Sequence, residues 1–227
     1  MPLRLTITLR SLLVPALVAG VAAGLVAACL QQLFLVPLIL QAEAVELGGA
    51  EHVQHGIDRA LYTALFDCLG AFGFALLLAA AFSWRSRISW KQGLLWGLAG
   101  YASFALAPAL GLPPELPGVE AAPLLGRQIW WIAAALATAG GIACMAFAPA
   151  GRLRLLGTVL IVLPHIIGAP GAEEASPLPA ELARHFAVGS LAVSAVMWMM
   201  LGAITAAMMK RTAGMASLTD TASSAGI

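Results

Sequence analysis

The sequence predicts an all-α fold: a polytopic bundle of transmembrane helices with six spans and both termini in the cytoplasm. Hydrophobic residues make up 61% of the 227 residues and charged residues only 10%, which leaves too little polar surface to cover a soluble globule. Long apolar runs separate the charged residues, and the loops between these runs alternate between basic and acidic composition. Together these observations indicate an integral membrane protein.

The predicted spans are the charge-poor runs, because a helix needs roughly 20 apolar residues to cross the hydrocarbon of a bilayer. We place them at about 11–41, 60–82, 92–113, 128–150, 155–171 and 186–209. The fifth run is the shortest and contains Pro164, so five spans are the alternative. We expect a single transmembrane domain over residues 1–211. Residues 212–227 are rich in Ala, Ser, Thr and Gly and predict a disordered cytoplasmic tail.

The first apolar run also has features of a targeting segment. Basic residues precede it, and Val26–Cys29 resembles the cleavage site of a bacterial lipoprotein. The run continues to Leu40, however, which a cleaved leader would not need. We therefore expect this segment to remain as an intact span.

The basic loops predict the orientation. The positive-inside rule places loops that are rich in Lys and Arg in the cytoplasm. Six spans put Lys210 and Arg211 on the same side as Arg152 and Arg154, whereas five spans would separate them. The charges therefore favour six.

Glycines mark the helix faces that we expect to pack closely. Small residues let membrane helices approach each other, and the GxxxG spacing is the best-known case. Gly20 and Gly24 have this spacing in the first run. Further glycines recur in the second and third runs, at Gly70, Gly73, Gly93, Gly97 and Gly100.

Asp67 is the only acidic residue inside a predicted span. An ionisable group at that depth is costly unless it is paired or hydrated, so its default interpretation is functional. Gln31 and Gln32 lie at about the same depth in the first run. We predict that these three residues form an intramembrane polar path for a cation, with a structural hydrogen-bonded cluster as the alternative.

All four histidines fall in or beside the acidic segments: His52, His55, His165 and His185. Imidazole and carboxylate groups together suit divalent first-row metals such as Co²⁺, Ni²⁺ and Zn²⁺. His52 and His55 are three residues apart, which would place both on one face of a helix. The alternative is that these side chains are simply solvated.

The segment Gly111–Gly118 contains three prolines within five residues. Prolines fix the backbone and exclude helix, so Glu115 is expected in a stiff turn at the outer face. Arg127 is its expected counter-ion, and a purely structural ion pair is the alternative. We predict an outer metal site formed by Glu115, His165, His52, His55 and His185.

Motifs of enzymes are missing from this sequence. It contains no P-loop, no HExxH pattern and no serine nucleophile motif, so we expect neither enzymatic activity nor a bound cofactor. Use of ATP would require another subunit. Nothing in the charge distribution indicates a nucleic-acid partner.

Five segments carry a resemblance to a known family: Leu94–Gly100, Ala107–Gly118, Arg127–Trp131, His165–Pro170 and Leu178–Leu182. They resemble the CbtA-type predicted cobalt transporter subunits. The resemblance implies a bacterial inner-membrane subunit that is linked to cobalamin biosynthesis and works beside a small single-span partner with a His-rich end. That family is usually described with five spans, whereas the charges here predict six.

The hypothesis from the sequence is therefore transport of Co²⁺ across the bacterial inner membrane, as a permease or membrane subunit. Ni²⁺ is the alternative ion, because most such sites bind it more tightly than Co²⁺. A second hypothesis makes the chain a membrane scaffold that anchors a metal-binding partner and binds no metal itself.

Overall fold

The computed structural model describes residues 9–46, 56–85, 88–119, 121–149, 151–171 and 178–224, and these residues contain helices and no strand. The α-helices are α1 (Leu9–Leu30), α2 (Val36–Glu46), α3 (Gly56–Ser83), α4 (Trp90–Tyr101), α5 (Ala107–Ala109), α6 (Leu124–Phe147), α7 (Gly151–Ile167) and α8 (Ala180–Ser224). Two π-helical segments, η1 (Gln31–Leu35) and η2 (Ala102–Leu106), join α1 to α2 and α4 to α5. The predicted all-α fold is confirmed.

Within the described residues, four helical stretches are long and apolar enough to cross a membrane: Leu9–Val45, Gly56–Ser83, Leu124–Phe147 and Ala180–Thr212. They contain the predicted spans at 11–41, 60–82 and 186–209 and nearly all of the span at 128–150. Large apolar side chains remain exposed along them, including Leu17, Phe66 and Leu136. Such surfaces suit a lipid solvent.

The other two predicted spans are largely helical, but they are not among the helices that are both long and apolar enough to cross a membrane. Residues 92–113 overlap α4, η2 and α5, which together run from Trp90 to Ala109. Residues 155–171 correspond to α7, whose 17 residues extend about 26 Å at 1.5 Å per residue. Gly168 ends α7 with a φ of +89°, and its N–H donates to the Pro164 carbonyl over 3.0 Å. The topology of six spans stays a prediction.

The chain divides into two compact units. The first unit comprises residues 1–29, 57–98 and 196–227, and the second unit comprises residues 30–56 and 99–195. The predicted single domain over 1–211 stays a prediction. The backbone of α8 is helical through Ser224, whereas composition predicts a disordered tail from residue 212. Ala, Met and Leu are good helix formers, and extending an existing helix needs no new nucleus.

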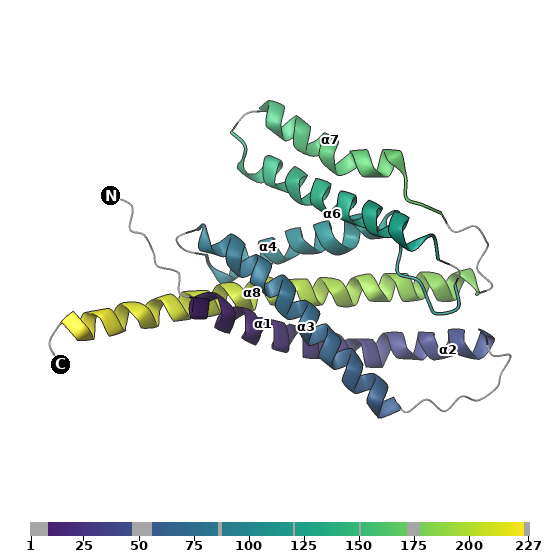
Figure 1. The fold of residues 1–227 in the computed structure, drawn as a ribbon, viewed down its shortest axis with the longest axis horizontal. Coiled ribbons are helices and arrows are strands. Elements are labelled where there is room, and N and C mark those ends of the chain that lie inside the picture. Colours follow the sequence, from purple (N-terminus) through teal and green to yellow (C-terminus); the bar gives the residue numbers. More distant parts are fainter. Residues whose placement is uncertain are drawn as a thin grey trace. The chain divides into compact units, whose positions relative to one another are not determined.

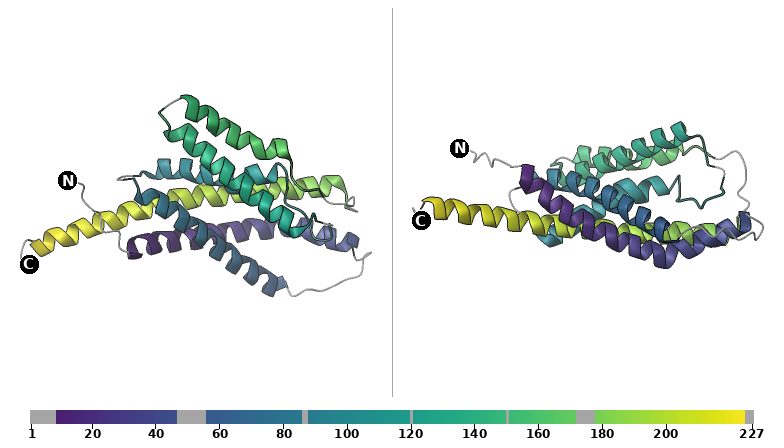
Figure 2. Two further views of the ribbon diagram at one scale, coloured as in Figure 1. Left: turned by 45° about the horizontal axis from the view of Figure 1, so that its top comes forward. Right: turned by 60° about the horizontal axis from the view of Figure 1, so that its bottom comes forward.

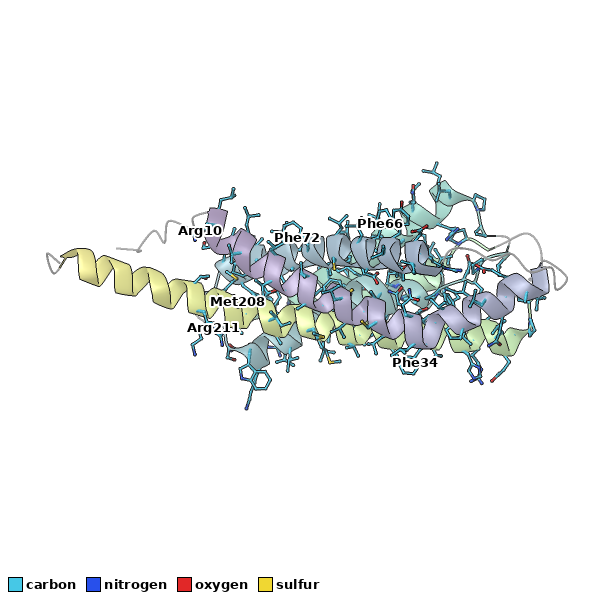
Figure 3. The ribbon with its side chains drawn as sticks, turned by 90° about the horizontal axis from the view of Figure 1, so that it is seen from below. Arg10, Phe34, Phe66, Phe72, Met208 and Arg211 are labelled. Atoms are coloured by element: carbon cyan, nitrogen blue, oxygen red, sulfur yellow. The ribbon has the colours of Figure 1, made fainter. Side chains whose placement is uncertain are left out.

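Glycines bring two pairs of helices together in the first unit. A Cβ atom at Gly20 would lie 2.5 Å from Cα of Phe72, and one at Gly24 would lie 2.5 Å from Cα of Cys68. The GxxxG face of α1 therefore packs directly on the backbone of α3, as predicted. Phe72, one of the α3 residues in this contact, is labelled in Figure 3. Gly93 and Gly97 of α4 contact the backbone of α8 in the same way, at Gly202 and Trp198.

Gly70 and Gly73 of α3 do not share this role. A Cβ atom at either position would meet nothing within 4 Å. Our prediction of close packing at these two residues is wrong. They lie on a different face of α3 from Cys68 and Phe72, and the sequence alone does not show which face meets a neighbour.

Both π-helical segments have the same relation to a proline. The N–H of Val36 donates to the carbonyl of Gln31, and the N–H of Ala107 donates to the carbonyl of Ala102. A proline follows each donor at once, Pro37 and Pro108. A proline cannot donate to the carbonyl four residues earlier, and its ring clashes with that carbonyl. The wider π-helical turn before the proline relieves this steric clash.

In the second unit, α6 and α7 form a helical hairpin and lie side by side (Figures 1 and 2). Their backbones come close at Gly141 and Gly157, where a Cβ atom on either glycine would lie 2.6 Å from the carbonyl oxygen of the other. Two facing glycines allow this backbone contact.

A small apolar core fixes the Pro-rich loop of the second unit. Leu116 from this loop packs with Ala42 of α2 and with Leu178, which precedes α8. Leu182 and Phe186 from the first turns of α8 cover the cluster. The loop is therefore held against α2 and α8.

Candidate functional site

The Pro-rich loop positions Glu115 through its neighbour. Leu116 is only 3% exposed and lies in the apolar core, whereas the Glu115 side chain is 30% exposed. With Leu116 buried in the core, the adjacent Glu115 side chain lies near Arg127 instead. Gly118, with a φ of +82°, then turns the chain in a conformation that favours glycine.

Arg127 of α6 forms the predicted ion pair with Glu115. Its Nη2 atom lies 3.8 Å from Oε2 of Glu115, and the Arg127 side chain is 37% exposed. This separation is longer than the 2.7–2.9 Å typical of a charge-assisted hydrogen bond. The two groups therefore attract each other without using up the donors of the guanidinium group.

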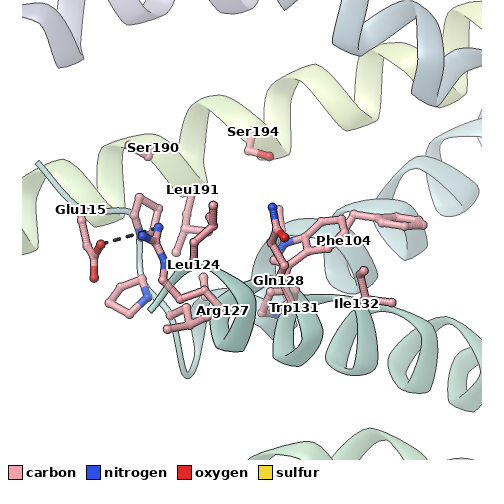
Figure 4. A pocket seen from close by; sticks show the side chains of 16 residues that line it. Phe104, Glu115, Leu124, Arg127, Gln128, Trp131, Ile132, Ser190, Leu191 and Ser194 are labelled. Atoms are coloured by element: carbon pink, nitrogen blue, oxygen red, sulfur yellow. Dashed lines mark ion pairs between the residues drawn. The ribbon is translucent and has the colours of Figure 1, made fainter. Parts of the chain in front are cut away.

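Both charged side chains line an open pocket of about 790 Å³ in the second unit. Figure 4 shows Glu115 and Arg127 toward one end of this pocket and Gln128, Phe104 and Ile132 toward the other. The remaining lining residues come from η2, α5, the Pro-rich loop, α6 and α8: Ala105, Pro108, Ala109, Leu112, Pro113, Pro114, Leu124, Trp131, Ser190, Leu191 and Ser194. We call this cavity the Glu115 pocket.

The helix α6 presents different side chains to two environments. Arg127, Gln128 and Trp131 line the Glu115 pocket, and the Trp131 ring packs against Phe104 with centroids 6.2 Å apart. Trp130 is turned instead toward α7. This follows from the helical period: Gln128, Trp131 and Ile132 are three or four residues apart and share one face, whereas Gly126, Trp130 and Ala133 share another face and line the apolar pocket described below.

His165 lies in the last turn of α7 and packs edge-on against Trp130, with ring centroids 5.9 Å apart. Its Nε2 atom is buried without a hydrogen-bond partner, and so is Nε1 of Trp130. An apolar pocket of about 590 Å³ lies beside Trp130 and Pro164. His165 is not among the residues that line the Glu115 pocket.

His185 has a different environment. Its Nε2 atom lies 3.0 Å from Oε1 of Glu181, which Arg184 also contacts at 2.7 Å. All three side chains are more than half exposed. An exposed cluster of this kind contributes little to stability.

The other predicted metal-binding histidines, His52 and His55, lie outside the described residues. Within the described ranges, no three His, Cys, Asp or Glu side chains are placed so that they could hold one metal ion. The predicted outer metal site therefore stays a prediction.

The residues of the predicted polar path belong to both units. Asp67 lies in α3 of the first unit, and Gln31 and Gln32 lie in η1 of the second unit. All three side chains are half-buried. The Nε2 atom of Gln32 is buried without a hydrogen-bond partner. The path itself stays a prediction.

Sequence reasoning missed Gln128 and Ser190 as pocket residues. Gln128 is next to Arg127 in an otherwise apolar helix, and Ser190 and Ser194 have the i, i+4 spacing of one helix face. A search for polar residues with helical spacing inside apolar segments would have found them.

No curated protein and no solved structure matches this chain significantly. Residues 9–210 match the family described as "Probable cobalt transporter subunit (CbtA)", and all the predicted site residues fall within this range. This family comprises transporter subunits and not enzymes, in agreement with the missing catalytic motifs. Because the match extends over most of an apolar, helical chain, this membrane protein belongs to the CbtA family of probable cobalt transporter subunits.

Proposed function

We propose that this chain carries Co²⁺ across the bacterial inner membrane, as a permease or membrane subunit that supplies cobalamin biosynthesis. The observation that carries the proposal is the family match over residues 9–210 of a chain with four long apolar helices. The proposed topology has six spans with both termini in the cytoplasm. The proposed partner is a small single-span protein with a His-rich end.

In this proposal the ion first meets the acidic outer loops and their histidines. Glu115 and His165 then bind it, and Asp67 with Gln31 and Gln32 passes it inward. Removing water from a divalent ion is costly, so oxygen and nitrogen ligands must replace that water at each step.

Two unpaired atoms support this route. The Nε2 atoms of His165 and Gln32 are buried without a hydrogen-bond partner. An unsatisfied buried polar group costs about 1–3 kcal/mol, so a water molecule or ligand that supplies its partner binds there favourably. The Nε2 atom of His165 can bind the ion itself, whereas the amide nitrogen of Gln32 can only donate to a water molecule that stays on the ion.

Cobalt uptake by cells that produce single variants tests the proposal. We expect Asp67→Asn, Glu115→Gln and His165→Ala each to lower uptake about tenfold or more, because each removes a proposed contact to the ion or its water. Asp220→Asn is the matched control, since it makes the same change outside the family match. Uptake equal to wild type in all three variants, at equal protein levels in the membrane, would exclude the proposed route.

The scaffold function is the second candidate. It is favoured by the finding that the described residues contain no group of three metal-binding side chains. In that case the partner would hold the metal, and this chain would only anchor the partner. Isothermal titration of the purified chain with Co²⁺ distinguishes the two functions, because a scaffold predicts no saturable binding.

A further inference from the structure

The Glu115 pocket is much larger than a hydrated metal ion. Its volume is about 790 Å³. Six water molecules around an ion occupy about 180 Å³, at about 30 Å³ each. Pockets for small organic molecules typically measure about 300–1,000 Å³. By size, this pocket suits an organic ligand.

The charges of the pocket do not favour a bare dication. Among the described residues that line it, Glu115 is the only acid and Arg127 the only base, so the lining has no net charge. Any attraction of Co²⁺ to Glu115 is opposed by the guanidinium group, whose Nη2 lies 3.8 Å from the carboxylate. A ligand that carries both a metal ion and a carboxylate avoids this opposition, because Glu115 attracts the ion while Arg127 can bind the carboxylate with two parallel hydrogen bonds.

The described lining also lacks the ligands that a bare ion would need. Glu115 is the only His, Cys, Asp or Glu side chain in the described lining. One carboxylate cannot replace the water shell of a divalent ion. An ion that arrives in a chelate brings most of its ligands with it, so the pocket needs to recognise only the chelator.

The rest of the lining is suited to the body of such a chelator. Trp131, 37% exposed, and Phe104 form an aromatic wall. Gln128, Ser190 and Ser194 add amide and hydroxyl groups that can donate to or accept from polar atoms. A charged group at one end and an aromatic wall elsewhere favour an organic carboxylate with a planar or apolar part.

We propose that the Glu115 pocket binds Co²⁺ as a complex with an organic carboxylate, with Arg127 as the partner of the carboxylate. The inference rests on the proposed function, because cobalt is taken as the cargo. It adds the chemical form in which the cargo is recognised.

Whether Arg127→Gln weakens or strengthens the binding of cobalt tests this inference. Full-length protein in detergent is titrated with three probes: Co²⁺ in a non-coordinating buffer, dipicolinate, and the one-to-one complex of Co²⁺ with dipicolinate, a planar aromatic dicarboxylate. We expect the wild-type protein to bind the complex at least about tenfold more tightly than either component alone. Arg127→Gln should weaken binding of the complex about tenfold or more, because a charge-assisted pair of hydrogen bonds is lost.

Arg152→Gln is the control, since Arg152 is an exposed arginine of α7 that does not line the pocket. It should leave all three affinities unchanged. The inference is overturned if bare Co²⁺ binds best and Arg127→Gln strengthens that binding, as removal of a repelling cation would predict. Equal binding of dipicolinate with and without cobalt, or no saturable binding of the complex, also overturns it.

The wild-type comparison needs no variant, so the test holds even if Arg127→Gln fails to fold. The outcome is also separate from that of the proposed function. Loss of cobalt uptake in the Asp67 and His165 variants would support transport whichever form of the ion the pocket prefers.

Discussion

At the scale of single residues, small changes of position on a helix separate two chemical environments. Arg127 and Trp131 line the Glu115 pocket, whereas Trp130 packs against His165 of α7. Trp130 is 7% exposed and fills the space in front of Gly111. The Pro-rich loop can therefore begin where it does only because residue 111 has no side chain.

A substitution at Gly111 tests this contact. A Cβ atom there would lie 2.5 Å from Cη2 of Trp130 and 2.8 Å from Cβ of Ala169. We expect Gly111→Ala to destabilise the protein by about 1–3 kcal/mol, as overpacking does, and to lower the thermal unfolding temperature in detergent.

Gly126→Ala is the matched control in the same unit. Its added Cβ would approach no atom closer than 3.6 Å, at Pro170, and alanine favours α6 over glycine by up to about 1 kcal/mol. We therefore expect an unchanged or higher unfolding temperature. If Gly111→Ala were as stable as Gly126→Ala, the proposed contact with Trp130 would not constrain the loop.

At the scale of elements, prolines and glycines determine how the helices bend and pack. Pro37 and Pro108 each follow a π-helical segment, and one of these segments places Phe104 and Ala105 in the pocket wall. Gly20 and Gly24 let α1 lie against α3. These residues shape the helices without touching a ligand.

The crossing of α1 and α3 can be tested with two equivalent substitutions. In Gly20→Ala the new Cβ would lie 2.5 Å from the backbone of Phe72, which cannot rotate away. We expect this variant to unfold at a lower temperature, with a loss of about 1–3 kcal/mol. Gly70→Ala adds a methyl group with nothing within 4 Å and should be neutral or slightly stabilising. Equal effects of the two substitutions would contradict the close crossing.

At the scale of the whole molecule, the charged loops predict the orientation in the membrane. Figure 3 shows Arg10 and Arg211 at the same end of the first unit. This agrees with the prediction that these two residues lie on the same side of the membrane; that this side is the cytoplasm stays a prediction. A fusion of green fluorescent protein or alkaline phosphatase after residue 211 checks the prediction.

With six spans the fluorescent fusion at 211 is bright and the phosphatase fusion is inactive. A pair of fusions after residue 118 is the control and should behave in the opposite way, because the acidic loop is predicted to face outward. Five spans would give an active phosphatase at 211.

Much of the fold could be predicted from local sequence patterns. Charge-poor runs of sufficient length predict helices, because only a helix satisfies its own backbone in lipid. The ion pair of Glu115 and Arg127 was also predictable, since one acid in a stiff loop has few partners within reach. The Glu115 pocket could not be predicted from the sequence, because Ser190 of α8 lies far from Glu115 along the chain. Only the packing of the helices brings both residues into the wall of one pocket.

By itself, the sequence determined that the protein is a helical membrane protein of a cobalt transporter family, because apolar length and recurring motifs are local properties. Only the tertiary structure decided that Gly20 packs while Gly70 does not, and that His165 meets Trp130 rather than the Glu115 pocket. The physical reason is that helical periodicity defines the faces of a helix, whereas long-range contacts select the neighbour that each face meets.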